Sequence, residues 1–127
     1  MNINHIAIWT MRLEELRDFY ITYFHGISND KYTNAAKGFE SYFIKFGNNS
    51  ASLELMRRKD ITSPHTGESI GLAHFSFSMG SKEAVLQQTE RFRQNGYVVA
   101  SEPRTTGDGF FESAVLDPDG NMIELTI

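Results

Sequence analysis

The chain has 127 residues, a formal net charge of −4 and no cysteine, and 40% of its residues are hydrophobic. A chain of this length and composition is expected to fold as one domain with a packed core. The lack of cysteine excludes disulfides, thiolate zinc sites and cysteine nucleophiles. The net charge argues against nucleic-acid binding, and no apolar run is long enough to cross a membrane. We therefore expect a cytoplasmic protein without a nucleic-acid or membrane partner.

The chain begins with a predicted strand and a predicted helix. Ile6 and Ile8 alternate with small or polar residues, and this period of two predicts the strand. Leucine and aromatic residues then recur at helical spacing over about 11–25. We expect Thr10 to cap the start of this helix and Gly26 to end it in the left-handed conformation.

A second helix is predicted over about 82–95, between Ser81 as its N-cap and Gly96 as its stop. Its inward face should consist of Val85, Leu86, Thr89 and Phe92. Further along, Asp117-Pro118-Asp119-Gly120 has the composition of a tight turn between the last two strands.

The two halves of the chain resemble each other, with an offset of about 70 residues. The matching segments are 4–8 with 73–77, 25–27 with 95–97, 39–41 with 111–113, and 53–55 with 123–125. Each half reads as a strand, a helix and three strands. We predict an α+β fold in one domain, 1–127, with βαβββ modules at about 1–56 and 72–127. The polar stretch 57–71 has the composition of a linker.

Four of the predicted strands carry a His or a Glu on the face opposite their apolar side chains, namely His5, Glu54, His74 and Glu124. Polar groups on an inner face are costly unless they are satisfied. Two imidazoles and two carboxylates would satisfy each other best around one divalent cation, and this donor set suits Ni²⁺, Co²⁺, Mn²⁺, Fe²⁺ or Zn²⁺. The alternative for each residue alone is a surface histidine or a solvated glutamate.

Several motifs resemble the vicinal oxygen chelate superfamily. They are His5-Ile6-Ala7-Ile8, Asp18-Phe19-Tyr20, Gly71-Leu72-Ala73-His74-Phe75, and Asp117-Pro118-Asp119-Gly120-Asn121 followed by Ile123-Glu124-Leu125. This superfamily includes glyoxalase I, fosfomycin-modifying thiol transferases, methylmalonyl-CoA epimerase, extradiol dioxygenases and bleomycin-binding proteins. The resemblance implies that the two modules form an open, cup-shaped mixed sheet around a metal ion, with the helices on the outer face.

Within that superfamily the ligand set is most similar to that of glyoxalase I, whose metal ligands carry over onto His5, Glu54, His74 and Glu124. The resemblance implies one Ni, Co or Zn ion per site. It also implies a lyase or isomerase acting on an α-hydroxycarbonyl, such as the hemithioacetal of a thiol, through an enediolate. Glu124 is then the expected base, with Glu54 as its possible partner in catalysis. In short family members the facing module often comes from a second chain, so a homodimer with its sites at the subunit interface is expected.

The substrate contacts depart from the glyoxalase I pattern. Trp9 stands where bacterial glyoxalase I usually has an arginine, and an asparagine expected after the second ligand is missing, because Met56 and Arg57 follow Glu54. We expect Trp9 and Met56 to line the substrate pocket, whereas Arg57 or Arg58 would replace the missing charge or lie in solvent. Two alternatives stay open. One is a non-catalytic protein that binds a small molecule or antibiotic, and the other is an epimerase or thiol transferase using the same metal centre.

Overall fold

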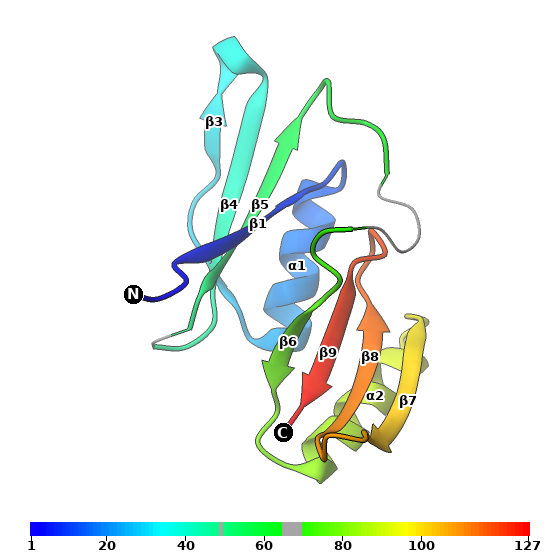
Figure 1. Cartoon of the computed structure of the whole chain (residues 1–127). Coiled ribbons are helices and arrows are strands. Elements are labelled where there is room, and N and C mark those ends of the chain that lie inside the picture. Colours follow the sequence, from blue (N-terminus) through cyan, green and yellow to red (C-terminus); the bar gives the residue numbers. More distant parts are fainter. Residues whose placement is uncertain (49, 65–69) are drawn as a thin grey trace. The chain divides into compact units, whose positions relative to one another are not determined.

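The computed structural model describes residues 1–48, 50–64 and 70–127, and it divides the chain into two compact units, Met1–Pro64 and His65–Ile127 (Figure 1). The boundary between the units falls inside the stretch 57–71 that we expected as a linker. His65 and Gly67 of that stretch lie outside the described residues. No helix in the described part of the chain is long and apolar enough to span a membrane.

The first unit consists of β1 (His5–Trp9), α1 (Leu13–Phe24), β2 (Ile27–Ser28), β3 (Tyr32–Asn34), the 3-10 turn η1 (Ala35–Lys37), β4 (Phe39–Lys45) and β5 (Ser52–Arg58). Its sheet has the order β1-β5-β4-β2, and β3 also pairs with β4. β1 runs parallel to β5, and the other pairs are antiparallel. The short strands β2 and β3 together take the place of one expected strand, because both pair with β4.

The second unit repeats this plan with β6 (Phe75–Ser78), α2 (Lys82–Gln94), β7 (Val99–Thr105), β8 (Phe111–Leu116) and β9 (Met122–Thr126). Its strands have the order β6-β9-β8-β7, and β6 runs parallel to β9. The predicted α+β fold of two βαβββ modules is therefore confirmed.

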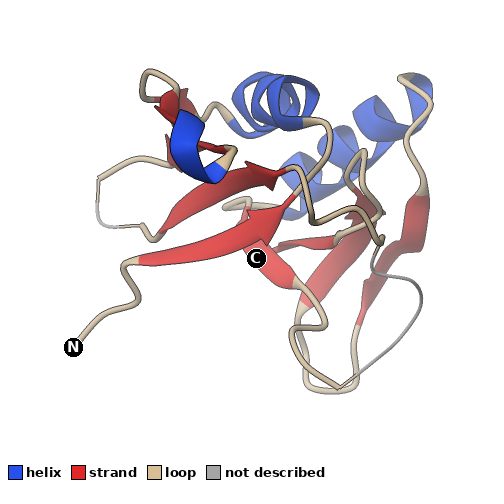
Figure 2. Cartoon of the chain, turned by 90° about the horizontal axis from the view of Figure 1, so that it is seen from above, coloured by secondary structure: helices blue, strands red, loops and turns tan. Residues whose placement is uncertain are grey.

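In each unit the helix covers one face of the sheet (Figure 2). The core of each unit lies between its helix and its sheet, because the apolar side chains of the strands alternate toward the helix. In the first unit the fully buried residues include Leu13, Leu16, Tyr20, Ile44 and Leu55, and in the second they include Val85, Phe92, Val115, Ile123 and Leu125.

One residue of α2 that we predicted to be in the core is exposed. Val85, Thr89 and Phe92 are buried, but Leu86 is 48% exposed. Thr89 is satisfied in the core because its hydroxyl donates to the Val85 carbonyl oxygen at 2.7 Å and lies 2.6 Å from the Ser113 hydroxyl. The spacing i, i+4, i+7 keeps these three residues on one face, whereas Leu86 is turned about 100° away from Val85.

The ends of α1 differ from the sequence prediction. The helix begins at Leu13 with Arg12 as its N-cap residue, so Thr10 is not the cap. Thr10 instead accepts a hydrogen bond from the Arg12 amide at 2.9 Å, which forms a turn before the helix. At the other end, His25 and not Gly26 takes the left-handed conformation, with φ of 54°. Ser81 and the positive φ of Gly96 at the ends of α2 are as predicted.

The Asp117-Pro118-Asp119-Gly120 turn joins β8 to β9 as predicted. Asp117 is buried, and its Oδ1 accepts from the amides of Asp119 and Asn121 at 3.0 and 2.9 Å. Gly120 has a φ of 85°, which a residue with a side chain adopts only with strain. The turn brings β9, and with it Glu124, back antiparallel to β8.

Gly26 is needed for close packing and not for a special backbone angle. A Cβ atom at this position would lie 2.4 Å from Cγ2 of Ile44, which is fully buried in β4. We predict that Gly26→Ala lowers the free energy of unfolding by about 1–3 kcal/mol, the usual cost of forcing an atom into a packed core.

Denaturant unfolding monitored by circular dichroism measures this effect. Gly107→Ala is the matched control, because Gly107 also lacks a positive φ and its added Cβ would meet no atom within 4 Å. Equal stabilities of the two variants would contradict the packing role of Gly26.

Candidate functional site

The first His–Glu pair lies on the face of the β1–β5 sheet that α1 does not cover. His5 comes from β1 and Glu54 from the middle of β5, and their Nε2 and Oε2 atoms are 3.7 Å apart. His5 Nδ1 lies 2.8 Å from Oδ1 of Asn4. If Nδ1 carries the proton and donates to Asn4, Nε2 keeps its lone pair and is free to act as a ligand.

The second pair lies at the corresponding place of the second unit. His74 immediately precedes β6, Glu124 is in β9, and Nε2 of the histidine is 3.2 Å from Oε2 of the glutamate. As in the first pair, the histidine is the more exposed partner and the glutamate the more buried one. Both pairs are therefore reachable from solvent on the imidazole side.

Strand register makes the two pairs equivalent. Glu54 is paired with Ala7, two residues after His5, and Glu124 is paired with Ser76, two residues after His74. Residues two apart on a strand point to the same face, so each histidine reaches across to the glutamate of the neighbouring parallel strand. Within each unit, the His and the Glu therefore lie on the same face of the sheet, as predicted.

The donor atoms of each pair fit a shared metal ion. Ligands about 2.0–2.2 Å from one ion, at angles of about 90–110°, lie about 3.0–3.5 Å from each other. The separation in the second pair falls in this range, and that in the first exceeds it slightly. No third His, Asp or Glu joins either pair within the described part of the chain. Each pair therefore offers one nitrogen and one carboxylate ligand, and a centre with all four stays a prediction.

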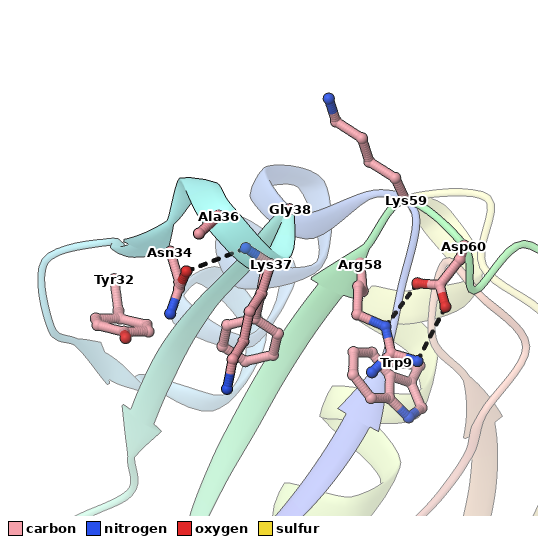
Figure 3. Close-up of a pocket in the computed structure, with 10 residues that line it drawn as sticks. Trp9, Tyr32, Asn34, Ala36, Lys37, Gly38, Arg58, Lys59 and Asp60 are labelled. Carbon is pink, nitrogen blue, oxygen red and sulfur yellow. Dashed lines mark hydrogen bonds and ion pairs between the residues drawn. The ribbon is translucent and has the colours of Figure 1, made fainter.

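An open hollow of about 820 Å³ lies in the first unit (Figure 3). Strand alternation places its Trp9 and Arg58 on the same face of the sheet as His5 and Glu54. Its lining residues are Trp9, Tyr32, Asn34, Ala36, Lys37, Gly38, Phe39, Arg58, Lys59 and Asp60. Trp9, expected as a pocket residue, forms part of its wall. Met56, the other expected pocket residue, pairs with Trp9 but is not among the lining residues.

Arg57 and Arg58 belong to β5 and not to the expected linker, and the alternation of the strand sends them to opposite faces. Arg57 donates from Nε to Oε2 of Glu40 at 2.7 Å, within a group that also contains Glu14 and Lys31. The hydrogen bond from Lys31 lowers the pKa of Glu14. Arg57 is therefore occupied on the helix side of the sheet and does not face the hollow.

Arg58 lies over the indole ring of Trp9, with its guanidinium carbon 5.3 Å from the ring centre. Its Nε and Nη2 donate to the two carboxylate oxygens of Asp60 at 2.6 and 3.1 Å. This bidentate bond raises the pKa of Arg58 and lowers the pKa of Asp60. Arg58 thus places a permanent positive charge beside Trp9.

Among the lining residues that sequence reasoning missed are Tyr32, Asn34, Lys37 and Phe39. Three of them lie in short elements, β3 and η1, that carry no periodic pattern. Phe39 could have been found, because it begins the repeated Phe-Glu-Ser segment and stands directly opposite Arg58 across β4 and β5.

A family model described as the Glyoxalase/Bleomycin resistance protein/Dioxygenase superfamily matches residues 2–125. The chain belongs to this family, which confirms the resemblance drawn from its motifs. A comparison with curated protein sequences gives no match.

Solved structures of glyoxalases share the fold. Glyoxalase I from Zea mays superposes with a TM-score of 0.81 at 22% identity, covering 98% of this chain and 44% of the maize chain. The trypanothione-dependent glyoxalase I from Leishmania major gives 0.79 at 22% identity, covering 99% and 86%. A glyoxalase family protein from Enterococcus faecalis gives 0.79 at 23% identity, covering 99% and 97%. This chain spans less than half of the maize enzyme, and at these identities the likeness shows the fold alone.

The equivalence of the pairs predicts equal contributions to metal binding. We expect His5→Ala and His74→Ala each to weaken the binding of Ni²⁺ or Zn²⁺ by at least about 10- to 100-fold, because removing a ligand costs no less than removing its supporting partner. Competition with a chromophoric chelator measures the affinity.

His25→Asn is the control for these variants. His25 is exposed and left-handed at the end of α1, and asparagine tolerates that conformation. Loss of metal affinity in only one of the two alanine variants would show that the pairs are not equivalent.

Proposed function

We propose that the protein is a metal-dependent lyase or isomerase of the glyoxalase I type. Its substrate would be an α-hydroxycarbonyl, such as the hemithioacetal of an aldehyde with a thiol. The observation that carries this proposal is the pair of His–Glu couples in equivalent register, with ligand atoms 3.7 and 3.2 Å apart. Family membership and the glyoxalase I fold of the solved structures support it.

Both couples together would supply two nitrogen and two carboxylate ligands, which suit Ni²⁺, Co²⁺ or Zn²⁺. When bound, such an ion acts as a Lewis acid that stabilises negative charge on the two neighbouring substrate oxygens. His5 and His74 would remain ligands throughout. Asn4 engages the other ring nitrogen of His5, and this contact holds the orientation of that imidazole.

The carboxylates would move the proton between the two neighbouring carbons. Glu124 would take it from one carbon and return it to the other, acting as a general base and then as a general acid. Each glutamate is more buried than its histidine. Partial exclusion of water strengthens the interaction of a carboxylate with nearby charge. Glu54 would hold the second carboxylate position and assist Glu124.

The proposal includes a homodimer in the cytoplasm. One module provides one His and one Glu, so a four-ligand centre needs two modules, from the same chain or from a partner chain. The absence of cysteine is compatible with a reducing compartment. The name of the Leishmania major enzyme calls it trypanothione-dependent, which makes a thiol adduct a reasonable first substrate to test here.

A binding protein without turnover is the second candidate. It is favoured by the exposed aromatic hollow around Trp9, which stands where bacterial glyoxalase I usually has an arginine. Metal content and catalysis distinguish the two candidates, because a binding protein needs neither.

We predict that protein purified without chelator carries about one divalent metal ion per chain and converts a methylglyoxal hemithioacetal. Elemental analysis gives the metal content, and thioester absorbance gives the rate with glutathione and with other thiols. Removal of the metal should abolish conversion, and adding Ni²⁺ or Zn²⁺ should restore it. Protein that holds no metal and binds none added would contradict the enzyme proposal and favour the binding protein.

We predict that Glu124→Gln lowers the rate of conversion by a factor of at least ~10² to 10⁴, the usual contribution of a general base. The amide keeps the size and one oxygen donor but cannot accept a proton from carbon. Glu54→Gln should lower the rate less.

Single-turnover conversion and deuterium uptake from solvent, with metal content measured on the same samples, test this prediction. Glu102→Gln is the control, because Glu102 is an exposed residue of β7 that forms an ion pair with Arg93 of α2. A Glu124 variant with wild-type rates at equal metal content would show that Glu124 is not the base.

A further inference from the structure

The aromatic hollow of the first unit has the features of a binding site for one end of a small molecule. Three aromatic rings line the hollow in a row. Trp9 and Phe39 are in edge-to-face contact with ring centres 6.2 Å apart, and Phe39 and Tyr32 lie 6.1 Å apart. Trp9 and Tyr32 are 40% and 53% exposed. Arg58 lies over one face of the indole ring, and the exposed remainder of these aromatic side chains offers a surface on which a flat group can stack.

The lining of the hollow also carries positive charge. The lining contains Lys37, Arg58 and Lys59 against the single carboxylate of Asp60. Asp60 engages only Nε and Nη2 of Arg58, and no acceptor in the described part of the chain is bound to Nη1. Lys37 extends its side chain between Tyr32 and Arg58, whereas Lys59 points away from the rings (Figure 3). Arg58 and Lys37 are therefore placed to receive anionic oxygens at the edge of a stacked ring.

The position of Lys37 is held by the local backbone. Lys37 ends the η1 turn, and its amide donates to Oδ1 of Asn34 at 3.1 Å. Gly38 follows in the left-handed conformation with a φ of 57°, which directs the chain into β4. A cation on a capped turn is better placed for recognition than one on an unsupported loop.

The hollow belongs to the first module alone. The two His–Glu pairs are equivalent, but the residue four positions after the histidine is Trp9 in one module and Ser78 in the other. The two modules thus have equivalent His–Glu pairs, but different residues surround those pairs. A difference of this kind between the modules allows a site to bind the two ends of a molecule through different contacts.

The distance along the strands indicates the shape of the ligand. Trp9 follows His5 by four residues, and Arg58 follows Glu54 by four, on the same face of parallel strands. At a rise of about 3.3 Å per residue the hollow lies about 13 Å from the His5–Glu54 pair. Its volume of about 820 Å³ is in the range of small-molecule pockets.

We propose that this hollow binds the planar, anionic end of an elongated small molecule. The ring would lie against Trp9 and Phe39, which are perpendicular to each other, so that it meets one of them face-on and the other edge-on. A carboxylate or phosphate would contact Arg58 and Lys37. Identifying this molecule as the substrate rests on the proposed function, whereas binding in the hollow does not.

Calorimetric titration of chelator-treated, metal-free protein tests the proposal. The probe is 2-naphthoate, with 2-naphthamide as the neutral flat control and cyclohexanecarboxylate as the anionic non-planar control. We expect one 2-naphthoate per chain, bound at least about tenfold more tightly than either control, because only this probe uses both rings and cations. Because Trp9 is the only tryptophan, its fluorescence should change on binding. A matching titration with 2-naphthyl phosphate shows which anionic group is preferred.

Lys37→Gln should weaken 2-naphthoate binding about three- to tenfold, as expected for the loss of one charged contact. Lys45→Gln is the matched control, because Lys45 is an exposed lysine of β4 outside the hollow. No binding of 2-naphthoate, equal binding of all the probes, or equal effects of the two lysine variants would each overturn the proposal.

Turnover separates this inference from the proposed function. If 2-naphthoate binds and changes Trp9 fluorescence but no hemithioacetal is converted, the hollow is established and the lyase proposal fails. If conversion occurs without 2-naphthoate binding, the lyase proposal stands and the hollow fails. Where both hold, Lys37→Gln should raise KM for a substrate with a planar anionic end and leave kcat unchanged.

Discussion

The parallel pairing between the first and last strand of each module is the constraint on which the rest of this structure depends. It places His5 beside Glu54 and His74 beside Glu124 with the same two-residue stagger. The pairing joins segments about 50 residues apart, so neither couple could form from local structure. The helix and the intervening strands provide the crossover that a parallel pair requires. They also provide the apolar face that keeps the strands together.

The two faces of the first sheet carry different kinds of side chain, because side chains alternate along each strand. On the helix side, Tyr42 and Leu55 are buried, and the group of Arg57, Glu40, Glu14 and Lys31 closes the edge of the core with ion pairs. On the other side lie the His5–Glu54 pair and the aromatic hollow. Arg57 and Arg58 are neighbours in sequence with unrelated roles, one structural and one facing the candidate ligand site.

Sequence reasoning succeeded where one local pattern determines the outcome. Ser81 caps α2 because its hydroxyl accepts a hydrogen bond from the Ala84 amide. The segment Asp117-Pro118-Asp119-Gly120 forms a turn because the Asp117 carboxylate and the backbone preferences of Pro and Gly act within the segment itself. It failed where a distant contact intervenes. Gly26 was expected to be left-handed, but the space beside it is filled by Ile44 of β4, and His25 takes the positive φ instead.

The sequence by itself determined the two βαβββ modules, the identity of the His and Glu residues, and their common phase on the strands, because periodicity and repetition are properties of the chain alone. Only the tertiary structure decided which strands are neighbours, that Arg58 and not Arg57 lies over Trp9, and that Tyr32, Lys37 and Phe39 join them in one hollow. These features depend on the register between β3, β4 and β5 and on a short capped turn. Register is set by the packing of whole strands, and no single segment contains that information.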